Sequence, residues 1–78
     1  EMRLLIVEDE PTLGQQLRNA LEGAGYAVDL ATDGEEGLYL GSNEQYDAII
    51  LDLGLPEIDG LTVLDRWRKE GKVTPVLV

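Results

Sequence analysis

The chain has 78 residues, enough for one domain, and its 6 basic and 16 acidic side chains give a net charge of −10. This negative charge opposes binding to nucleic acid, which needs lysine and arginine to neutralise phosphates. Cysteine and histidine are absent, which excludes disulfides, thiolate or histidine zinc sites and a phosphohistidine carrier role. No apolar run approaches a membrane span and no signal peptide is visible, so a cytoplasmic protein is expected. Glu1 precedes Met2 and is expected to be foreign to the natural chain.

The first predicted element is a strand over residues 3–7, whose apolar run ends at two adjacent carboxylates, Glu8 and Asp9. Pro11 fits the first turn of a helix, where a missing N–H group costs nothing, and the helix is predicted over about 11–24. Apolar residues recur at helical spacing along it and form one stripe: Leu13, Leu17, Ala20, Leu21 and Ala24. The pattern therefore predicts a strand followed by an amphipathic helix.

A second strand is predicted over residues 27–31, where the partial alternation is typical of an edge strand. Thr32 and Glu35 have the spacing of a capping box, which predicts a helix with Thr32 as its N-cap. This helix is expected to end near residue 42, although each of its two internal glycines costs roughly 1 kcal/mol relative to alanine. The small glycines would, however, permit close packing on the sheet.

The next apolar run, over residues 47–52, indicates a strand buried on both faces and ends in Asp52. A loop over 53–59, a helix over about 60–70 and the start of a fourth strand over 75–78 follow. The helix is expected to turn its apolar side chains toward the core: Val63, Leu64 and Trp67. Aspartate often merely starts a turn, so Asp52 alone is consistent with either a structural or a functional role.

The order β-α-β-α-β-α-β predicts an α/β fold in which helices cover both faces of a parallel sheet. If the first and third strands are neighbours, Glu8, Asp9 and Asp52 meet at the carboxyl edge, where open α/β sheets bind ligands. Clustered carboxylates repel each other unless a cation neutralises them, and oxygen ligands at such an edge suit Mg²⁺. A carboxylate left over can act as a nucleophile toward a phosphoryl group.

The runs at 7–10, 51–56 and 59–60 (VEDE, LDLGLP and DG) together resemble the receiver domain of bacterial two-component response regulators. The most similar class is the OmpR/PhoB type of transcriptional regulator, and the resemblance covers residues 2–78. It implies a doubly wound, flavodoxin-like sheet that is incomplete here, with strand order 2-1-3-4.

The resemblance also implies a role for each acidic position. Asp52 matches the residue that accepts phosphate from a sensor histidine kinase. Asp9 matches a direct ligand of Mg²⁺, Glu8 a residue that helps to hold the ion through water, and Gly54 the backbone carbonyl that completes the protein ligands. The domain is thus expected to be a phosphoacceptor signalling domain and not a turnover enzyme, because its substrate is its own aspartate.

A complete receiver also has a threonine or serine after the fourth strand and a lysine at the end of a fifth strand. Both would lie beyond Val78, together with the fourth helix, fifth strand and fifth helix that carry the family's dimer and effector surface. We therefore expect a partial receiver whose homodimer and DNA contacts depend on absent regions. The exposed fourth strand is expected to make the isolated fragment self-associate.

Two other functions are also consistent with the sequence. A haloacid-dehalogenase-like phosphohydrolase also uses an aspartate after an apolar strand, but it needs a second aspartate two positions later as general acid, where this chain has Gly54. A pseudo-receiver would act only as an interaction module without phosphorylation. The presence of all three acidic residues, Glu8, Asp9 and Asp52, disfavours a pseudo-receiver.

Overall fold

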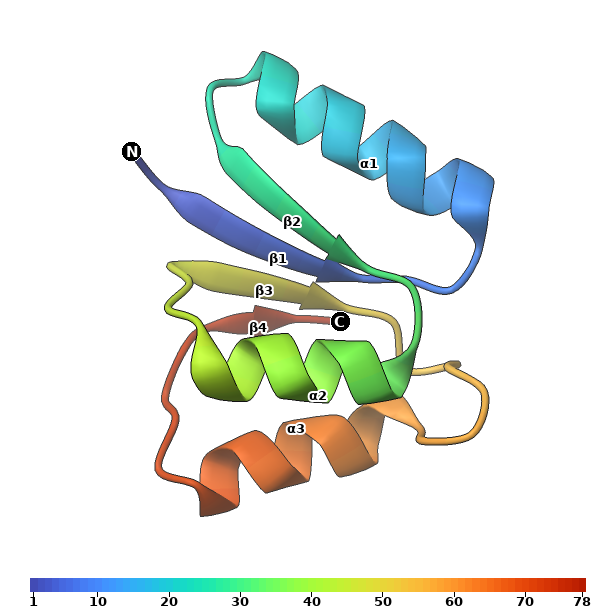
Figure 1. Ribbon diagram of the computed structural model, residues 1–78, viewed down its shortest axis with the longest axis vertical. Coiled ribbons are helices and arrows are strands. Elements are labelled where there is room, and N and C mark those ends of the chain that lie inside the picture. Colours follow the sequence, from blue (N-terminus) through green and yellow to red (C-terminus); the bar gives the residue numbers. More distant parts are fainter.

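The computed structural model describes all 78 residues, and its strands and helices alternate along the chain (Figure 1). The strands are β1 (Arg3–Val7), β2 (Ala27–Ala31), β3 (Ala48–Leu51) and β4 (Val76–Leu77). The helices are α1 (Pro11–Gly23), α2 (Gly34–Asn43) and α3 (Gly60–Lys69). All strands are parallel and their order is β2-β1-β3-β4, which confirms the fold and the strand order expected from the resemblance. No helix combines the length and hydrophobicity needed to cross a membrane.

The register of the two central strands fixes where their ends lie. Val7 of β1 is opposite Leu51 of β3, so both strands stop at the same level. The ladder continues for one residue, because the Asp52 N–H donates to the Val7 carbonyl at 3.0 Å and the Glu8 N–H donates to the Ala31 carbonyl at 3.0 Å. The residues that follow β1 and β3 therefore leave the sheet side by side at its carboxyl edge.

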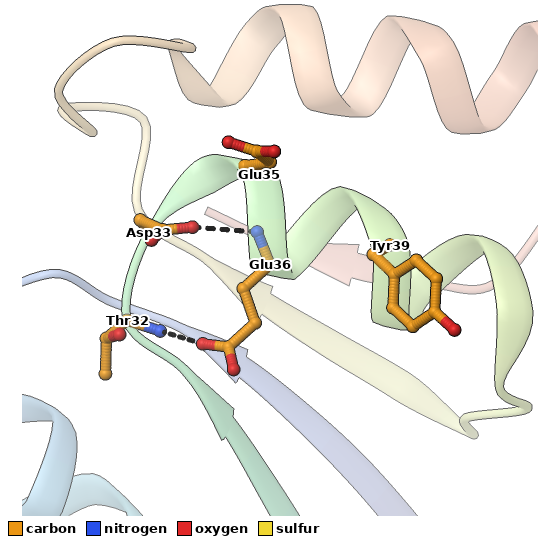
Figure 2. A pocket seen from close by; sticks show the side chains of 5 residues that line it. All are labelled: Thr32, Asp33, Glu35, Glu36 and Tyr39. Atoms are coloured by element: carbon orange, nitrogen blue, oxygen red, sulfur yellow. Dashed lines mark hydrogen bonds between the residues drawn. The ribbon is translucent and has the colours of Figure 1, made fainter.

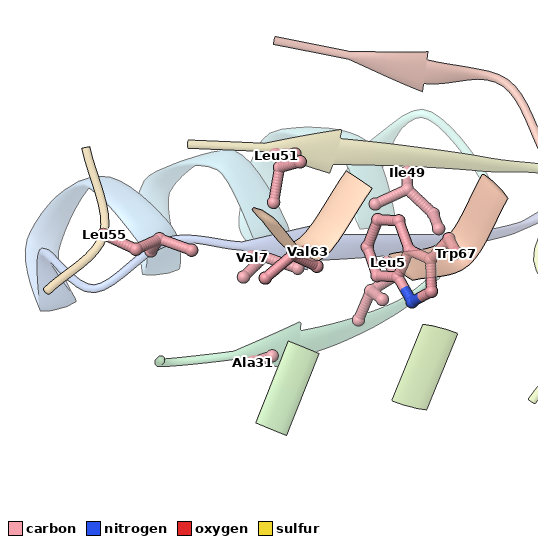
Figure 3. Close-up of a cluster of buried hydrophobic side chains, with 8 residues drawn as sticks. All are labelled: Leu5, Val7, Ala31, Ile49, Leu51, Leu55, Val63 and Trp67. Atoms are coloured by element: carbon pink, nitrogen blue, oxygen red, sulfur yellow. The ribbon is translucent and has the colours of Figure 1, made fainter. Parts of the chain in front are cut away.

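The larger core lies between the sheet and the helices α2 and α3 (Figure 3). It joins eight buried side chains: Leu5, Val7, Ala31, Ile49, Leu51, Leu55, Val63 and Trp67. Trp67 is 1% exposed and its indole N–H donates to the Leu38 carbonyl at 3.3 Å, which confirms that it is a core residue. A Cβ at Gly41 would overlap the Trp67 indole, and a Cβ at Gly37 would lie 2.7 Å from Cγ1 of the buried Val7, so packing requires both of the glycines that weaken α2.

The opposite face is covered by α1, and here the predicted stripe is only partly buried. Leu17 and Leu21 are half-buried against the smaller core of Leu4, Ile6 and Val28. The other predicted members are exposed: Leu13, Ala20 and Ala24. The helix approaches the sheet through Gly14, its only buried residue, and no second helix of the chain packs along its flank.

The predicted capping box of α2 is wrong by one residue. The N-cap is Asp33, whose carboxylate accepts the Glu36 N–H at 2.7 Å, and Glu36 in turn accepts the Thr32 N–H at 2.9 Å (Figure 2). Thr32 and Glu35 have the same spacing, so the pattern alone allowed either pair. Aspartate is at least as good an N-cap as threonine, and its charge is favourable at the positive end of the helix.

Candidate functional site

Three carboxylates meet at the carboxyl edge of the sheet. Glu8 and Asp9 follow β1, and Asp52 follows the neighbouring β3. Each contributes one carboxylate oxygen to a group whose members all lie within 4.8 Å of one another. The structure thus brings together the side chains that the sequence placed at this edge, and it does so through the matched ends of two adjacent strands.

The backbone holds two of these carboxylates in place. Glu8 is buried, and its Oε2 accepts the N–H of Glu10 at 3.1 Å. Asp52 is half-buried, and its Oδ1 accepts the N–H of Gly54 at 2.9 Å. Asp9 is exposed to solvent. The site therefore has two oriented carboxylates and a third that faces water.

The charge of this cluster is not neutralised within the chain. Burial raises the pKa of Glu8, and the nearby charges of Asp52 and Asp9 raise it further, while the hydrogen bond from Glu10 lowers it. None of the four ion pairs in the chain involves Glu8, Asp9 or Asp52. Carboxylates at this separation repel each other, so the arrangement favours a bound cation.

The donor atoms fit a hard divalent cation. All are oxygens, and an open edge leaves room for the water ligands that Mg²⁺ retains. Gly54 lies two residues beyond Asp52 and is tied to its carboxylate, but the role of its carbonyl as a ligand stays a prediction. The remaining carboxylate of the acidic motif, Glu10, is used elsewhere: it caps α1 by accepting the N–H groups of Thr12 at 3.2 Å and Leu13 at 2.6 Å. Its place directly before Pro11 is the sequence signal for that role.

Two residues anchor the loop 53–59 that follows Asp52. Leu55 is 6% exposed and belongs to the larger core. Asp59 is the N-cap of α3 and accepts the Thr62 N–H at 2.9 Å. Between them, Glu57 has a φ of 65° and is the only residue other than glycine in the left-handed region.

Replacing Glu57 with glycine is expected to raise the free energy of unfolding by about 0.5–1 kcal/mol. A left-handed conformation costs roughly 1–2 kcal/mol for residues other than glycine, and the greater flexibility of unfolded glycine offsets part of that gain. Chemical denaturation would measure the change. Glu35→Gly, at an exposed position inside α2, is the matched control and is expected to lose about 1 kcal/mol. A loss of stability in Glu57→Gly would contradict the account of this loop.

The largest surface hollow, of about 470 Å³, lies beside the first turn of α2 and not at the carboxylate cluster (Figure 2). Its lining residues are Thr32, Asp33, Glu35, Glu36 and Tyr39. Asp33 and Glu36 already accept backbone N–H groups of the helix cap. The hollow is wide open to solvent and none of its residues belongs to the cluster at the sheet edge, so the cluster remains the candidate functional site.

Comparison with known proteins identifies the family. The model of the response regulator receiver domain matches residues 4–78. The chain belongs to this family. The relatives that it matches are transcriptional regulators of the OmpR/PhoB type, and among them the transcriptional activator protein IrlR of Burkholderia pseudomallei is 53% identical over 76 residues, which is 97% of this chain and 33% of IrlR. This receiver chain thus spans about a third of the length of such relatives.

Solved receiver structures have the same fold. The receiver domain of a Francisella response regulator superposes with a TM-score of 0.93 at 32% identity, over 97% of this chain and 63% of that one. The response regulator TrrA of Thermotoga maritima, solved in complex with Mg²⁺ and BeF, gives a TM-score of 0.85 at 40% identity, over 90% of this chain and 61% of that one. The carboxylate cluster therefore lies in a receiver fold, which is a signalling domain of two-component systems.

Proposed function

We propose that this receiver takes a phosphoryl group from a sensor histidine kinase onto Asp52, with Mg²⁺ held by the carboxylates of Glu8, Asp9 and Asp52 and by the Gly54 carbonyl. The observation that carries the proposal is the group of three carboxylates, within 4.8 Å of one another, at the carboxyl edge of a receiver sheet. The Mg²⁺ complex of TrrA supports the choice of ion.

The chain's own residues suit an attack on phosphorus. Oδ1 of Asp52 accepts the Gly54 N–H at 2.9 Å, which leaves Oδ2 as the oxygen that we expect to attack. A new P–O bond forms on Oδ2 as the P–N bond of the kinase phosphohistidine breaks, and the imidazole leaves with the electron pair. Mg²⁺, when bound, neutralises charge on the phosphoryl oxygens. Glu8 and Asp9 would hold the ion through their negative charge.

We also propose a context for this domain in the intact protein. Residues 2–78 would form the N-terminal part of a cytoplasmic receiver that is not a turnover enzyme, within a homodimeric protein that binds DNA through another region. The transcriptional regulators among its relatives support this view of the intact protein. Self-association of the isolated 78-residue stretch is supported by Leu77, which is 62% exposed in β4, the strand at one edge of the sheet.

The test is phosphate incorporation by the intact protein. After incubation with acetyl phosphate and Mg²⁺, mass spectrometry is expected to find one added phosphate that hydroxylamine removes, because acyl phosphates react with hydroxylamine. Omission of Mg²⁺ is expected to abolish the addition. An intact protein that never gains phosphate from acetyl phosphate or a kinase would contradict the proposal and favour a pseudo-receiver.

Magnesium is expected to stabilise the folded protein through this site. Binding to the folded state alone adds about 2.7 kcal/mol when the free ion exceeds its dissociation constant 100-fold. Asp9→Asn is expected to lose most of this gain, yet to be at least as stable as the natural sequence without metal, because one repelling charge has gone. Thermal unfolding at constant ionic strength measures both quantities, with Asp65→Asn, an exposed position in α3, as control. A melting temperature that ignores Mg²⁺ in the natural sequence would count against the site.

A further inference from the structure

Helices α2 and α3 begin in the same way, with an aspartate N-cap followed by a glycine. The pairs are Asp33-Gly34 and Asp59-Gly60. Neither glycine has a positive φ, so neither is required by its backbone conformation. Alanine would also be a better helix residue than glycine by about 1 kcal/mol. The reason for glycine at both positions must therefore be the space around it.

Gly60 lies against the end of β3. A Cβ at this position would lie 2.5 Å from the carbonyl oxygen of Asp52 and 2.7 Å from the Cα of Leu53. The Gly60 N–H also donates to the Leu53 carbonyl at 3.3 Å, which closes the loop onto its own start. The obstructing atoms belong to the backbone of Asp52 and its neighbour, so a side chain at Gly60 would have to push the residue that carries the acceptor carboxylate.

Gly34 confines the same loop from a different helix. A Cβ at Gly34 would lie 2.7 Å from the carbonyl oxygen of Ile58 and 3.2 Å from its Cβ. Ile58 is half-buried and packs against the larger core, so it has little freedom to move away. The loop 53–59 is thus enclosed by the first residue of α3 and by the first residue of α2.

We infer that Gly60 and Gly34 are positioning residues for the Asp52 site, an inference that rests on the proposed function. An added Cβ at either position must displace loop backbone by a distance approaching 1 Å before its contacts reach ordinary values. Mg²⁺ requires near-ideal octahedral geometry with ligands at about 2.0–2.1 Å and adapts poorly to such shifts. Gly34 acts on the site although α2 contributes none of the proposed ligands.

The experiment compares alanine substitutions at four glycines in the intact protein. Gly60→Ala and Gly34→Ala test the inference. Gly41→Ala is the structural control, because its Cβ would overlap the Trp67 indole and touches no part of the loop, and Gly23→Ala is the neutral control, because nothing lies within 4 Å of its Cβ. NMR titration with MgCl₂, followed on the backbone amides of residues 52–54, gives the dissociation constant of the folded state. Denaturation without Mg²⁺ gives the stability separately.

Gly60→Ala and Gly34→Ala are expected to weaken Mg²⁺ binding by roughly 10- to 100-fold, the usual effect of losing a residue that orients metal ligands. Gly41→Ala is expected to lose stability while its folded state retains the natural dissociation constant. If one loop variant does not fold, the other decides by the same criterion. Unchanged Mg²⁺ binding in the loop variants, or equal weakening in Gly41→Ala, would overturn this inference and leave the proposed function standing. Failure of the natural sequence to bind Mg²⁺ would overturn the proposed function and this inference with it.

Discussion

Substitution of Asp52 by asparagine is expected to abolish phosphate incorporation from acetyl phosphate or a kinase. The amide has nearly the same shape and can still accept the Gly54 N–H through its oxygen, so the loop should keep its fold. It lacks the negative oxygen that attacks phosphorus, and an amide is a far weaker nucleophile than a carboxylate. The effect is therefore a loss of reactivity with little change in stability, and intact-protein mass spectrometry with Mg²⁺ present measures it.

Asp65→Asn is the matched control for this substitution. Asp65 lies on α3, its side chain is 59% exposed, and its ion pair with Lys69 is a surface pair of little energetic weight. The control is expected to gain phosphate at the natural rate. Incorporation at that rate in Asp52→Asn would show that another side chain is the acceptor.

Replacing Trp67 with alanine is expected to lower the free energy of unfolding by about 3–5 kcal/mol. The indole is 1% exposed and packs in the larger core with Val63 from its own helix and with strand side chains such as Leu5 (Figure 3). Its loss would leave a cavity beside Gly41, which has no side chain to fill it. Small domains have only about 5–15 kcal/mol of net stability, so this substitution should remove a large part of the free energy of unfolding.

Chemical denaturation checks this expectation against two companions. Trp67→Phe should lose less stability than Trp67→Ala, because phenylalanine keeps most of the ring volume. The loss that remains comes mainly from the hydrogen bond to the Leu38 carbonyl, which phenylalanine cannot donate. Leu61→Ala removes a side chain that is 62% exposed on the same helix and should change stability by less than about 0.5 kcal/mol. If Trp67→Ala costs no more than Leu61→Ala, the description of the core is wrong.

The ends of β1 and β3 were predictable because their signal is local. Each strand is an apolar run that stops at a carboxylate, and the run itself marks the element and its end. The meeting of Glu8, Asp9 and Asp52 followed once these strands were placed side by side. The order of the strands came from the family resemblance, since periodicity alone does not select neighbours in a sheet.

Other features depend on contacts that no local pattern contains. Thr32 and Asp33 are adjacent and both have a glutamate three residues later, so the sequence pattern does not choose between them as N-cap of α2. Leu13 is exposed because α1 contacts the sheet through Gly14 at this end. The helical spacing of apolar residues does not predict this contact. The sequence pattern also does not show why Gly34 and Gly60 are glycines. A Cβ at either position would overlap backbone atoms that are distant in sequence or lie across a turn.

Direct localisation of the phosphate tests the central claim most sharply. The intact protein is incubated with acetyl phosphate and Mg²⁺, digested at low temperature, and its peptides are sequenced by tandem mass spectrometry. The modified peptide is expected to carry the phosphate on Asp52, and no modified peptide is expected when Mg²⁺ is replaced by a chelator. Phosphate on Glu8 or Asp9, or on Asp52 without any need for the ion, would contradict this expectation.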